Sequence, residues 1–183
     1  MAFAEHRRWP DNPHIRAKIL VHAGTLAHYT ADLHMPLHTT VLFDGRVPPA
    51  APVPGAGKGF HARVDALPTK VPYAEIFAQP LDAPEAHAEL MPFIAAEFAE
   101  SHALLDRVYE LAPHIPALPD LTLESEGVRA FTIERTRASA RFTASIFLSA
   151  WRNSKHIKIE PWLDRRVFDD GFDPAKVRPQ PAP

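Results

Sequence analysis

The stretch from His28 to His38 concentrates the side chains of this chain that are most able to do chemistry. It reads His-Tyr-Thr-Ala-Asp-Leu-His-Met-Pro-Leu-His and holds three histidines and one aspartate within eleven residues. His28 and Asp32 are four residues apart, which places them one turn apart on one face of a helix. Pro36 disfavours helix at Met35, so His38 beyond it can return to the same pocket. Imidazole nitrogens and carboxylate oxygens are ligands of zinc and similar divalent ions.

A second pair with the same spacing, His61 and Asp65, follows after a loop. The spacing alone is weak, because it occurs twice more on or just after amphipathic helices, where we expect solvent-facing ionic pairs: His102 with Asp106, and His156 with Glu160. The composite is more specific, since it brings five ligand-type residues onto three short pieces: His28, Asp32, His38, His61 and Asp65. We expect His34, which departs from that face, to be structural or to support a ligand. The sequence therefore predicts a metal site.

Composition restricts the classes of protein and site that remain. The chain has 183 residues, a formal net charge of -2 and no cysteine, with 46% hydrophobic and 23% charged residues. No global basic field recommends nucleic acid as a partner, although bound divalent ions would supply positive charge locally. Thiolate zinc sites are excluded, so any metal must bind His, Asp, Glu or backbone. No apolar run approaches the ~20 residues of a membrane span, and the first residues lack a secretion signal. We expect a cytoplasmic chain as given, or a secreted or periplasmic one if it is a fragment.

Hydrophobic periodicity predicts an all-α fold, a helical bundle with a long Pro/Gly-rich loop at the metal site. We expect a single helical domain over 1–160, with the metal motif at 28–65 and a Pro-rich extension at 161–183. Asp11 or Asn12 would cap the first long helix, with Pro13 at its first position. The expected segments are a helix over 13–33, a loop over 39–60, a short helix over 61–71, a long amphipathic helix over 83–112 and another helix over 125–153.

The motif resembles the zinc centre of a known superfamily, that of zinc-dependent phospholipase C and the single-strand-specific nucleases. The resemblance lies in His-Tyr-x-x-Asp-x-His-x-Pro-Leu-His followed by Gly-Phe-His-Ala-Arg-Val-Asp, over about forty residues from Ala27 to Asp65. The Asp-x-His-x-Pro-Leu-His wording is closer to the nucleases. The resemblance implies an all-helical fold with three zinc ions in a cleft, where phosphate esters are hydrolysed.

Carried over by position, the resemblance assigns a role to each candidate ligand. His28 matches a ligand of the first zinc, and Asp32 matches the carboxylate that bridges the first and third zincs. The three protein ligands of the second zinc are matched by His38, His61 and Asp65. The second site is therefore complete in this chain, and three protein ligands with an open position are the arrangement of a catalytic zinc.

The sequence also departs from the family pattern. In the family, an amino-terminal tryptophan chelates the third zinc with help from a nearby histidine, and an aspartate and a histidine from upstream helices complete the first site. Trp9 is not a terminal residue here. The local candidates for the missing ligands are His6, Asp11 and His14, and their spacing is not typical of a metal site. The chain is accordingly interpreted as a fragment, a divergent member or a metal-binding remnant, and a second subunit or a missing amino-terminal segment would complete the first site.

Two functions from different classes follow from these residues. The first is a zinc-dependent phosphodiester hydrolase with one to three zinc ions, acting on single-stranded nucleic acid or on a phospholipid head group. The second is a non-catalytic or truncated helical domain in which one zinc ion fastens the loop and stabilises the fold by mass action. A di-iron bundle is disfavoured because Glu-x-x-His is absent, and a serine hydrolase because Gly-x-Ser-x-Gly is absent.

Overall fold

The fold is all-α, as the periodicity predicts. The structure is a computed structural model and describes residues 1–45, 52–118 and 120–159, which contain no β-strand. The α-helices are α1 (Ala2–Arg8), α2 (Pro13–Leu33), α3 (Phe60–Ala66), α4 (Tyr73–Ile76), α5 (Leu90–Ala103), α6 (Leu105–Leu111) and α7 (Glu126–Asn153). Short 3₁₀ helices join them: η1 (Pro36–Thr39), η2 (Leu67–Lys70), η3 (Ala112–His114) and η4 (Ser154–His156).

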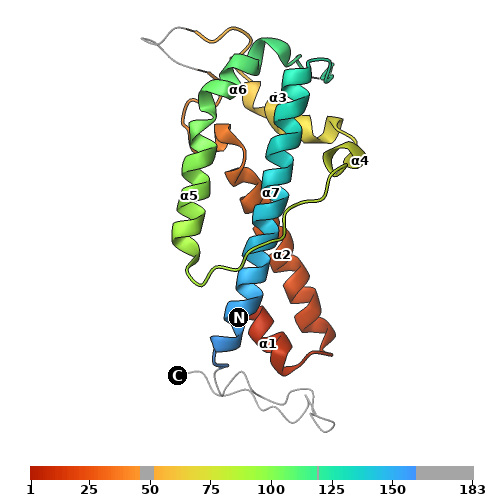
Figure 1. Cartoon of the computed structure of the whole chain (residues 1–183), viewed down its shortest axis with the longest axis vertical. Coiled ribbons are helices and arrows are strands. Elements are labelled where there is room, and N and C mark those ends of the chain that lie inside the picture. The colour runs from red at the N-terminus through yellow and green to blue at the C-terminus, as the bar shows by residue number, and fades with distance from the viewer. Residues whose placement is uncertain (46–51, 119, 160–183) are drawn as a thin grey trace, which may run out of the picture.

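Helix α7 runs along the length of an elongated bundle, and the other elements are arranged around it (Figure 1). It packs against α2, and α1 packs against both α2 and η4 at the lower end. Helices α3 and α6 lie at the opposite, upper end. None of the helices in the described ranges combines the length and hydropathy that crossing a membrane requires.

Helix α2 begins and ends where its sequence requires. The Asn12 side chain accepts hydrogen bonds from the backbone amides of His14 and Ile15, and Pro13 occupies the first helical position. Asn12 is thus the cap, as one of the two predicted candidates. At the other end, the helix stops two residues before Met35, which adopts an extended backbone ahead of Pro36. The chain then turns into η1, which carries His38.

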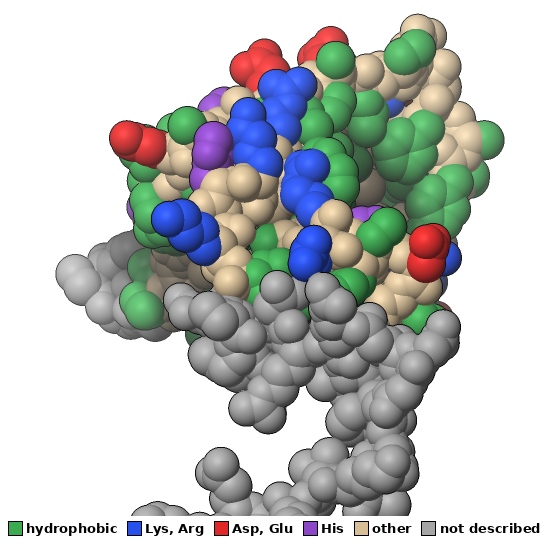
Figure 2. Space-filling view, turned by 90° about the horizontal axis from the view of Figure 1, so that it is seen from below, with side chains coloured by type: hydrophobic (Ala, Val, Ile, Leu, Met, Phe, Trp, Pro, Cys, Tyr) green, Lys and Arg blue, Asp and Glu red, His purple; other side chains and the backbone are tan. Residues whose placement is uncertain are grey.

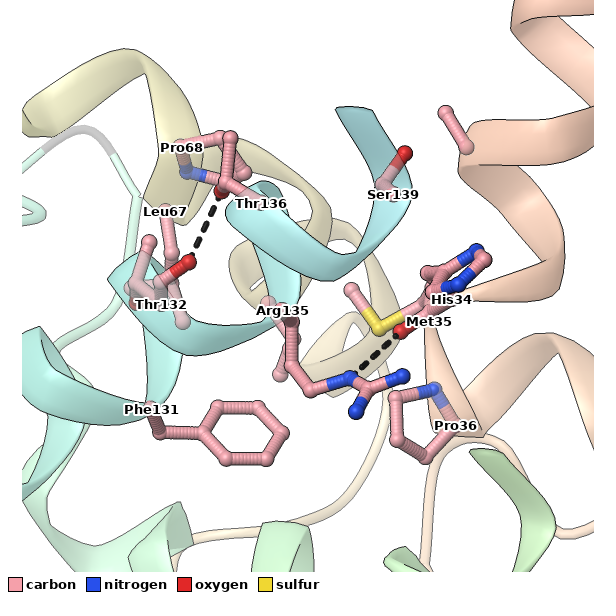
Figure 3. A pocket seen from close by; sticks show the side chains of 12 residues that line it. His34, Met35, Pro36, Leu67, Pro68, Phe131, Thr132, Arg135, Thr136 and Ser139 are labelled. Carbon is pink, nitrogen blue, oxygen red and sulfur yellow. Dashed lines mark hydrogen bonds between the residues drawn. The ribbon is translucent and has the colours of Figure 1, made fainter. Parts of the chain in front are cut away.

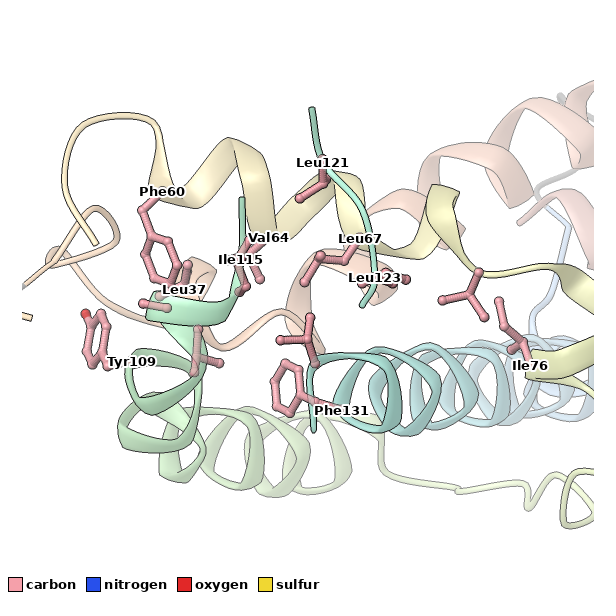
Figure 4. Packing of buried hydrophobic residues seen from close by; sticks show 14 residues of the cluster. Leu37, Phe60, Val64, Leu67, Ile76, Tyr109, Ile115, Leu121, Leu123 and Phe131 are labelled. Atoms are coloured by element: carbon pink, nitrogen blue, oxygen red, sulfur yellow. The ribbon is translucent and has the colours of Figure 1, made fainter. Parts of the chain in front are cut away.

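The hydrophobic core lies at the upper end of the bundle, directly beneath the segment that carries the second ligand pair. It includes Phe60 and Val64 from α3, Val108 from α6 and Phe131 from α7 (Figure 4). Phe60 is fully buried, and it directly precedes His61. Because burial of a phenylalanine side chain stabilises by about 1.5–3 kcal/mol, this anchor fixes the first turn of α3.

The single long helix predicted over 83–112 is wrong. Residues 81–89 are extended, and the helical part is divided at Leu104 into α5 and α6. The extended segment is held to α7 because the backbone amides of Glu85 and His87 donate to the hydroxyls of Ser145 and Ser149. These two donors replace the intrahelical bonds that a helix would have given, and periodicity alone does not reveal them.

The other predicted elements agree with the structure within a few residues. The short helix predicted over 61–71 is α3 followed by η2, with Pro68 in the tighter 3₁₀ turn. The helix predicted over 125–153 is α7, which Ser125 caps through the backbone amide of Val128. The predicted extension at 161–183, and Glu160 with it, lie outside the described residues.

Candidate metal centre

His38, His61 and Asp65 form a compact group of metal-ligand side chains. Their nearest ligand atoms all lie within 4.8 Å of one another. The Asp65 carboxylate lies between the imidazoles, with Oδ1 3.3 Å from His38 Nε2 and Oδ2 3.2 Å from His61 Nε2. Donors about 2.0–2.1 Å from a tetrahedral zinc ion are about 3.3–3.4 Å apart. The spacing of these nitrogens and oxygens therefore fits the edges of a zinc coordination shell.

The side chain of His61 gives a second indication that the group fits a metal. Its Nε2 atom is buried and makes no hydrogen bond, although the Asp65 carboxylate is nearby. The same ring packs edge-on against His38, with ring centroids 4.6 Å apart. A buried ring nitrogen without a hydrogen-bond partner is rare, because the missing bond costs about 1–3 kcal/mol. A metal ion would supply the partner, so the donor set and the orphaned nitrogen both fit zinc.

His28 and Asp32 lie beside this group. Asp32 uses one oxygen toward His28, with 3.4 Å between Oδ2 and Nε2, and the other toward His38, with 3.4 Å between Oδ1 and Nδ1. The five predicted residues therefore form one connected chain of contacts. His28 is 72% exposed, whereas the side chain of His38 is 24% exposed. A carboxylate on the second nitrogen of a ligating histidine fixes the orientation of its ring, and Asp32 has that position at His38.

Asp44 positions the second ligand pair, and the sequence analysis missed it. Its carboxylate accepts hydrogen bonds from the backbone amides of His61, at 3.1 Å, and Gly59, at 3.2 Å. Asp44 thus satisfies orphan donors at the start of α3 from across the loop. The His61 amide, followed by that of Gly59, lowers the pKa of the Asp44 carboxyl below its ordinary value. No sequence pattern indicates this contact, because the acceptor lies 17 residues before His61.

His34 is buried and structural, in the role predicted for it. Its Nδ1 lies 2.9 Å from the carbonyl oxygen of Thr30, and its Nε2 lies 3.2 Å from Glu97 Oε2. Burial lowers the pKa of His34 below its ordinary value, with the nearby Arg135 charge acting in the same direction. Arg135 also donates from Nε to the His34 carbonyl oxygen, at 3.2 Å. These contacts fasten the end of α2, and hence the turn that leads to His38, to α5 and α7.

The amino-terminal candidates lie far from this group. The upper end of the bundle carries α3, whereas α1 and the first turn of α2 lie at the lower end (Figure 1). His6 is near Trp151, with ring centroids 6.2 Å apart, and Asp11 pairs with Arg16. His14 is in the first turn of α2. Neither these residues nor Trp9, which ends α1, lies at the candidate centre within one chain.

Lysine and arginine side chains gather at the lower end of the bundle. Figure 2 shows them close together in the view from below. Arg7 in α1 and Lys155 in η4 belong to this end. At the other end, the candidate centre contains the carboxylates of Asp32 and Asp65.

Of the two other pairs with the same spacing, His102 and Asp106 both lie among the described residues. His102 is exposed, and its Nδ1 contacts Thr39 of η1, 3.1 Å from the hydroxyl. The pair of His156 and Glu160 extends outside the described residues. His102 thus supports the segment next to His38 from α5, which the spacing did not predict.

Comparison of the chain with protein-family models, with curated proteins and with solved structures finds no match. A function for this chain is therefore proposed from the geometry of the His/Asp group and from the sequence motif that contains it.

Proposed function

We propose that the chain is a zinc-dependent phosphodiester hydrolase of the nuclease or phospholipase C type that its motif resembles. The observation that carries the proposal is the convergence of His38, His61 and Asp65, with nitrogen–oxygen separations of 3.2–3.3 Å. Three protein ligands leave one position open for water or substrate, as in catalytic zinc sites. The orphaned His61 Nε2 supports the same assignment.

Bound zinc supplies Lewis acidity and lowers the pKa of water, so that a nucleophile is available at neutral pH. The protein's part is to hold and orient the donors. Asp32 fixes the His38 ring through Nδ1, and Asp44 fixes the turn that presents His61. The Asp65 carboxylate offers one oxygen toward each imidazole. Because His61 and Asp65 are both on α3, a shift of this helix would move two of the three donors together.

His28 and Asp32 would contribute to a further ion, as the resemblance implies for the first zinc. Two donors are too few for a zinc site, so a second subunit or a preceding segment would complete it. The outer face of α2 is suited to such a contact, because Leu20 and Val21 are 72% and 68% exposed on the same helix as the exposed His28. The substrate class is a phosphate ester: single-stranded nucleic acid or a phospholipid head group.

A non-catalytic role for the metal has one specific observation in its favour. In the part of the chain that the structure describes, His38, His61 and Asp65 are the one compact group of three metal ligands. One ion there would join η1 to α3 and close the loop between them. Such an ion stabilises the folded state in proportion to its concentration, without any turnover.

Zinc content per chain, measured with cleavage of bis(4-nitrophenyl) phosphate, tests the proposal. The protein is purified metal-free and reconstituted with zinc, alongside His61→Ala and, as the matched control, His22→Ala. We expect zinc-dependent cleavage in the wild type and in the His22 variant, with both zinc and cleavage lost in the His61 variant. Bound zinc without cleavage would instead establish the non-catalytic role, and unchanged zinc content in His61→Ala would refute the ligand assignment.

A further inference from the structure

A small, mainly apolar cavity lies between the turn that follows α2, the α3–η2 segment and α7. Its volume is about 180 Å³, and its walls include Met35 and Pro36, Leu67, and Phe131 (Figure 3). Ligand pockets for drug-sized molecules measure ~300–1,000 Å³, so this cavity suits a smaller molecule. It adjoins the metal motif in sequence but contains none of the predicted metal ligands.

Arg135 is the cationic side chain in this lining, and it is nine-tenths buried. Its side chain is 9% exposed, and Figure 3 shows the guanidinium group between the Phe131 ring and Pro36. Nε donates to the His34 carbonyl oxygen. Nη2 is buried and has no hydrogen-bond acceptor among the described residues. A charged donor left without an acceptor is costly to bury, so this nitrogen is suited to receive an acceptor from a ligand.

The charge of Arg135 is compensated by three carboxylates, Glu97, Glu100 and Glu134, without a hydrogen bond to any of them. Its Nη1 lies 3.9 Å from carboxylate oxygens of Glu100 and Glu134, beyond hydrogen-bonding distance, and those side chains are 62% and 44% exposed. Solvent screens exposed charges strongly. Burial also lowers the pKa of the Arg135 guanidinium, although arginine stays protonated in proteins. Nη2 itself therefore has no hydrogen-bonded carboxylate among the described residues.

The remaining polar groups of the lining give little competition for that donor. The hydroxyls of Thr132 and Thr136 donate to backbone carbonyls of their own helix, at 2.8 and 2.7 Å. The lining also includes the buried His34 imidazole and the Ser139 hydroxyl, and its other walls are hydrocarbon, the Met35 sulfur and the Phe131 ring. The cavity thus combines one cationic hydrogen-bond donor with apolar surface, a combination complementary to an oxyanion attached to an apolar group.

We propose that this cavity binds a small organic acid, a carboxylate joined to a compact apolar group, whose oxygen accepts from the Arg135 guanidinium while the apolar part lies against Phe131 and Leu67. The site goes beyond the proposed hydrolase function and needs no metal ion. Binding of such an acid would also fasten α7 to the turn before His38, because Arg135 and Met35 line the same cavity.

Isothermal titration of metal-free full-length protein with hexanoate, in the presence of chelator, tests the proposal. We expect saturable binding of hexanoate and at least tenfold weaker binding of 1-hexanol, which lacks the charge. Arg135→Met should weaken hexanoate binding at least tenfold. Ser139→Phe, which retains Arg135 but fills the cavity from α7, should do the same. Arg152→Met, an exposed position at the far end of α7, should leave binding unchanged.

Three outcomes would overturn this assignment. Absence of hexanoate binding at millimolar concentration would mean that Arg135 serves only to fasten α2 to α7. Equal affinity for hexanol and hexanoate, or unchanged affinity in a folded Arg135→Met protein, would show that the charge plays no part. Tighter binding of hexyl phosphate than of hexanoate would assign the cavity to phosphate esters. Because the assay contains no metal, its failure is distinct from failure of the hydrolase proposal.

Discussion

Removing the His61 imidazole should abolish the stabilisation of the fold by zinc. His61 supplies one of three donors, and its Nε2 atom has no other partner in the described structure. His38 and Asp65 remain in His61→Ala, but two donors bind zinc far more weakly than three. Since the donors come from η1 and α3, zinc binds the folded chain and not the unfolded one, and its binding free energy adds to stability.

The expected effect can be worked out from mass action. At a free zinc concentration 100 times the dissociation constant, binding stabilises the native state by about 2.7 kcal/mol. A chain of this size gains about 2–4 °C in melting temperature for each kcal/mol. Zinc should therefore raise the melting temperature of the wild type by about 5–11 °C, and leave that of His61→Ala within about 1 °C of its metal-free value.

Differential scanning calorimetry with and without zinc measures the shift directly. His22→Ala, on α2 but not among the ligands, should show the same shift as the wild type, because exposed histidines bind zinc singly and weakly. An equal zinc-induced shift in His61→Ala would refute the reasoning. A shift that occurs in the wild type but disappears in His22→Ala would place the metal at the other end of the bundle.

Four further substitutions should have measurable effects on stability. Asp44→Asn should destabilise the fold by about 1 kcal/mol at pH 7, measured by urea unfolding. Because folding lowers the pKa of Asp44, this difference should vanish as pH falls through its folded pKa. Gly55→Ala should cost more than about 1 kcal/mol, since φ is +80° and the new Cβ would lie 2.5 Å from the Ala112 carbonyl oxygen, whereas Gly24→Ala should stabilise by about 0.5–1 kcal/mol. Burial lowers the pKa of His34, so the unfolded chain takes up a proton first and the free energy of unfolding should fall as pH drops below 6.5. His34→Gln should reduce this dependence of stability on pH.

The sequence could predict the elements whose signals are local. Asn12 before Pro13 marks the start of α2, and Pro36 marks its end, because caps and prolines act within a few residues. Apolar spacing likewise predicts a helix over 125–153, which is α7, and Val128 and Phe131 are buried on it. The juxtaposition of His38 with His61 and Asp65 followed from the motif as a whole rather than from any one spacing.

The contacts that hold the site are long-range, and no local pattern reports them. The Asp44 carboxylate accepts hydrogen bonds from the backbone amides of Gly59 and His61, which lie on the other side of the loop in the sequence. Arg135 reaches the His34 carbonyl across 101 residues of sequence. The extended segment before α5 was predicted as helix for the same reason, since its amides bond to hydroxyls on α7. Tertiary partners decided these features, and propensity is a weak prior wherever such partners exist.

The donors on α3 and the donor in η1 are held in place by different contacts. Variants of these contacts should therefore differ in whether they lower the stability of the fold or only the affinity for zinc. His61 and Asp65 are carried by α3, which is anchored by the fully buried Phe60 and by the Asp44 cap. His38 is carried by a turn that Arg135 fastens to α7. Truncation of Phe60 should therefore remove about 3–5 kcal/mol of stability together with metal binding. Loss of the Arg135 contact should instead loosen His38 alone, leaving α3 folded and the metal more weakly held.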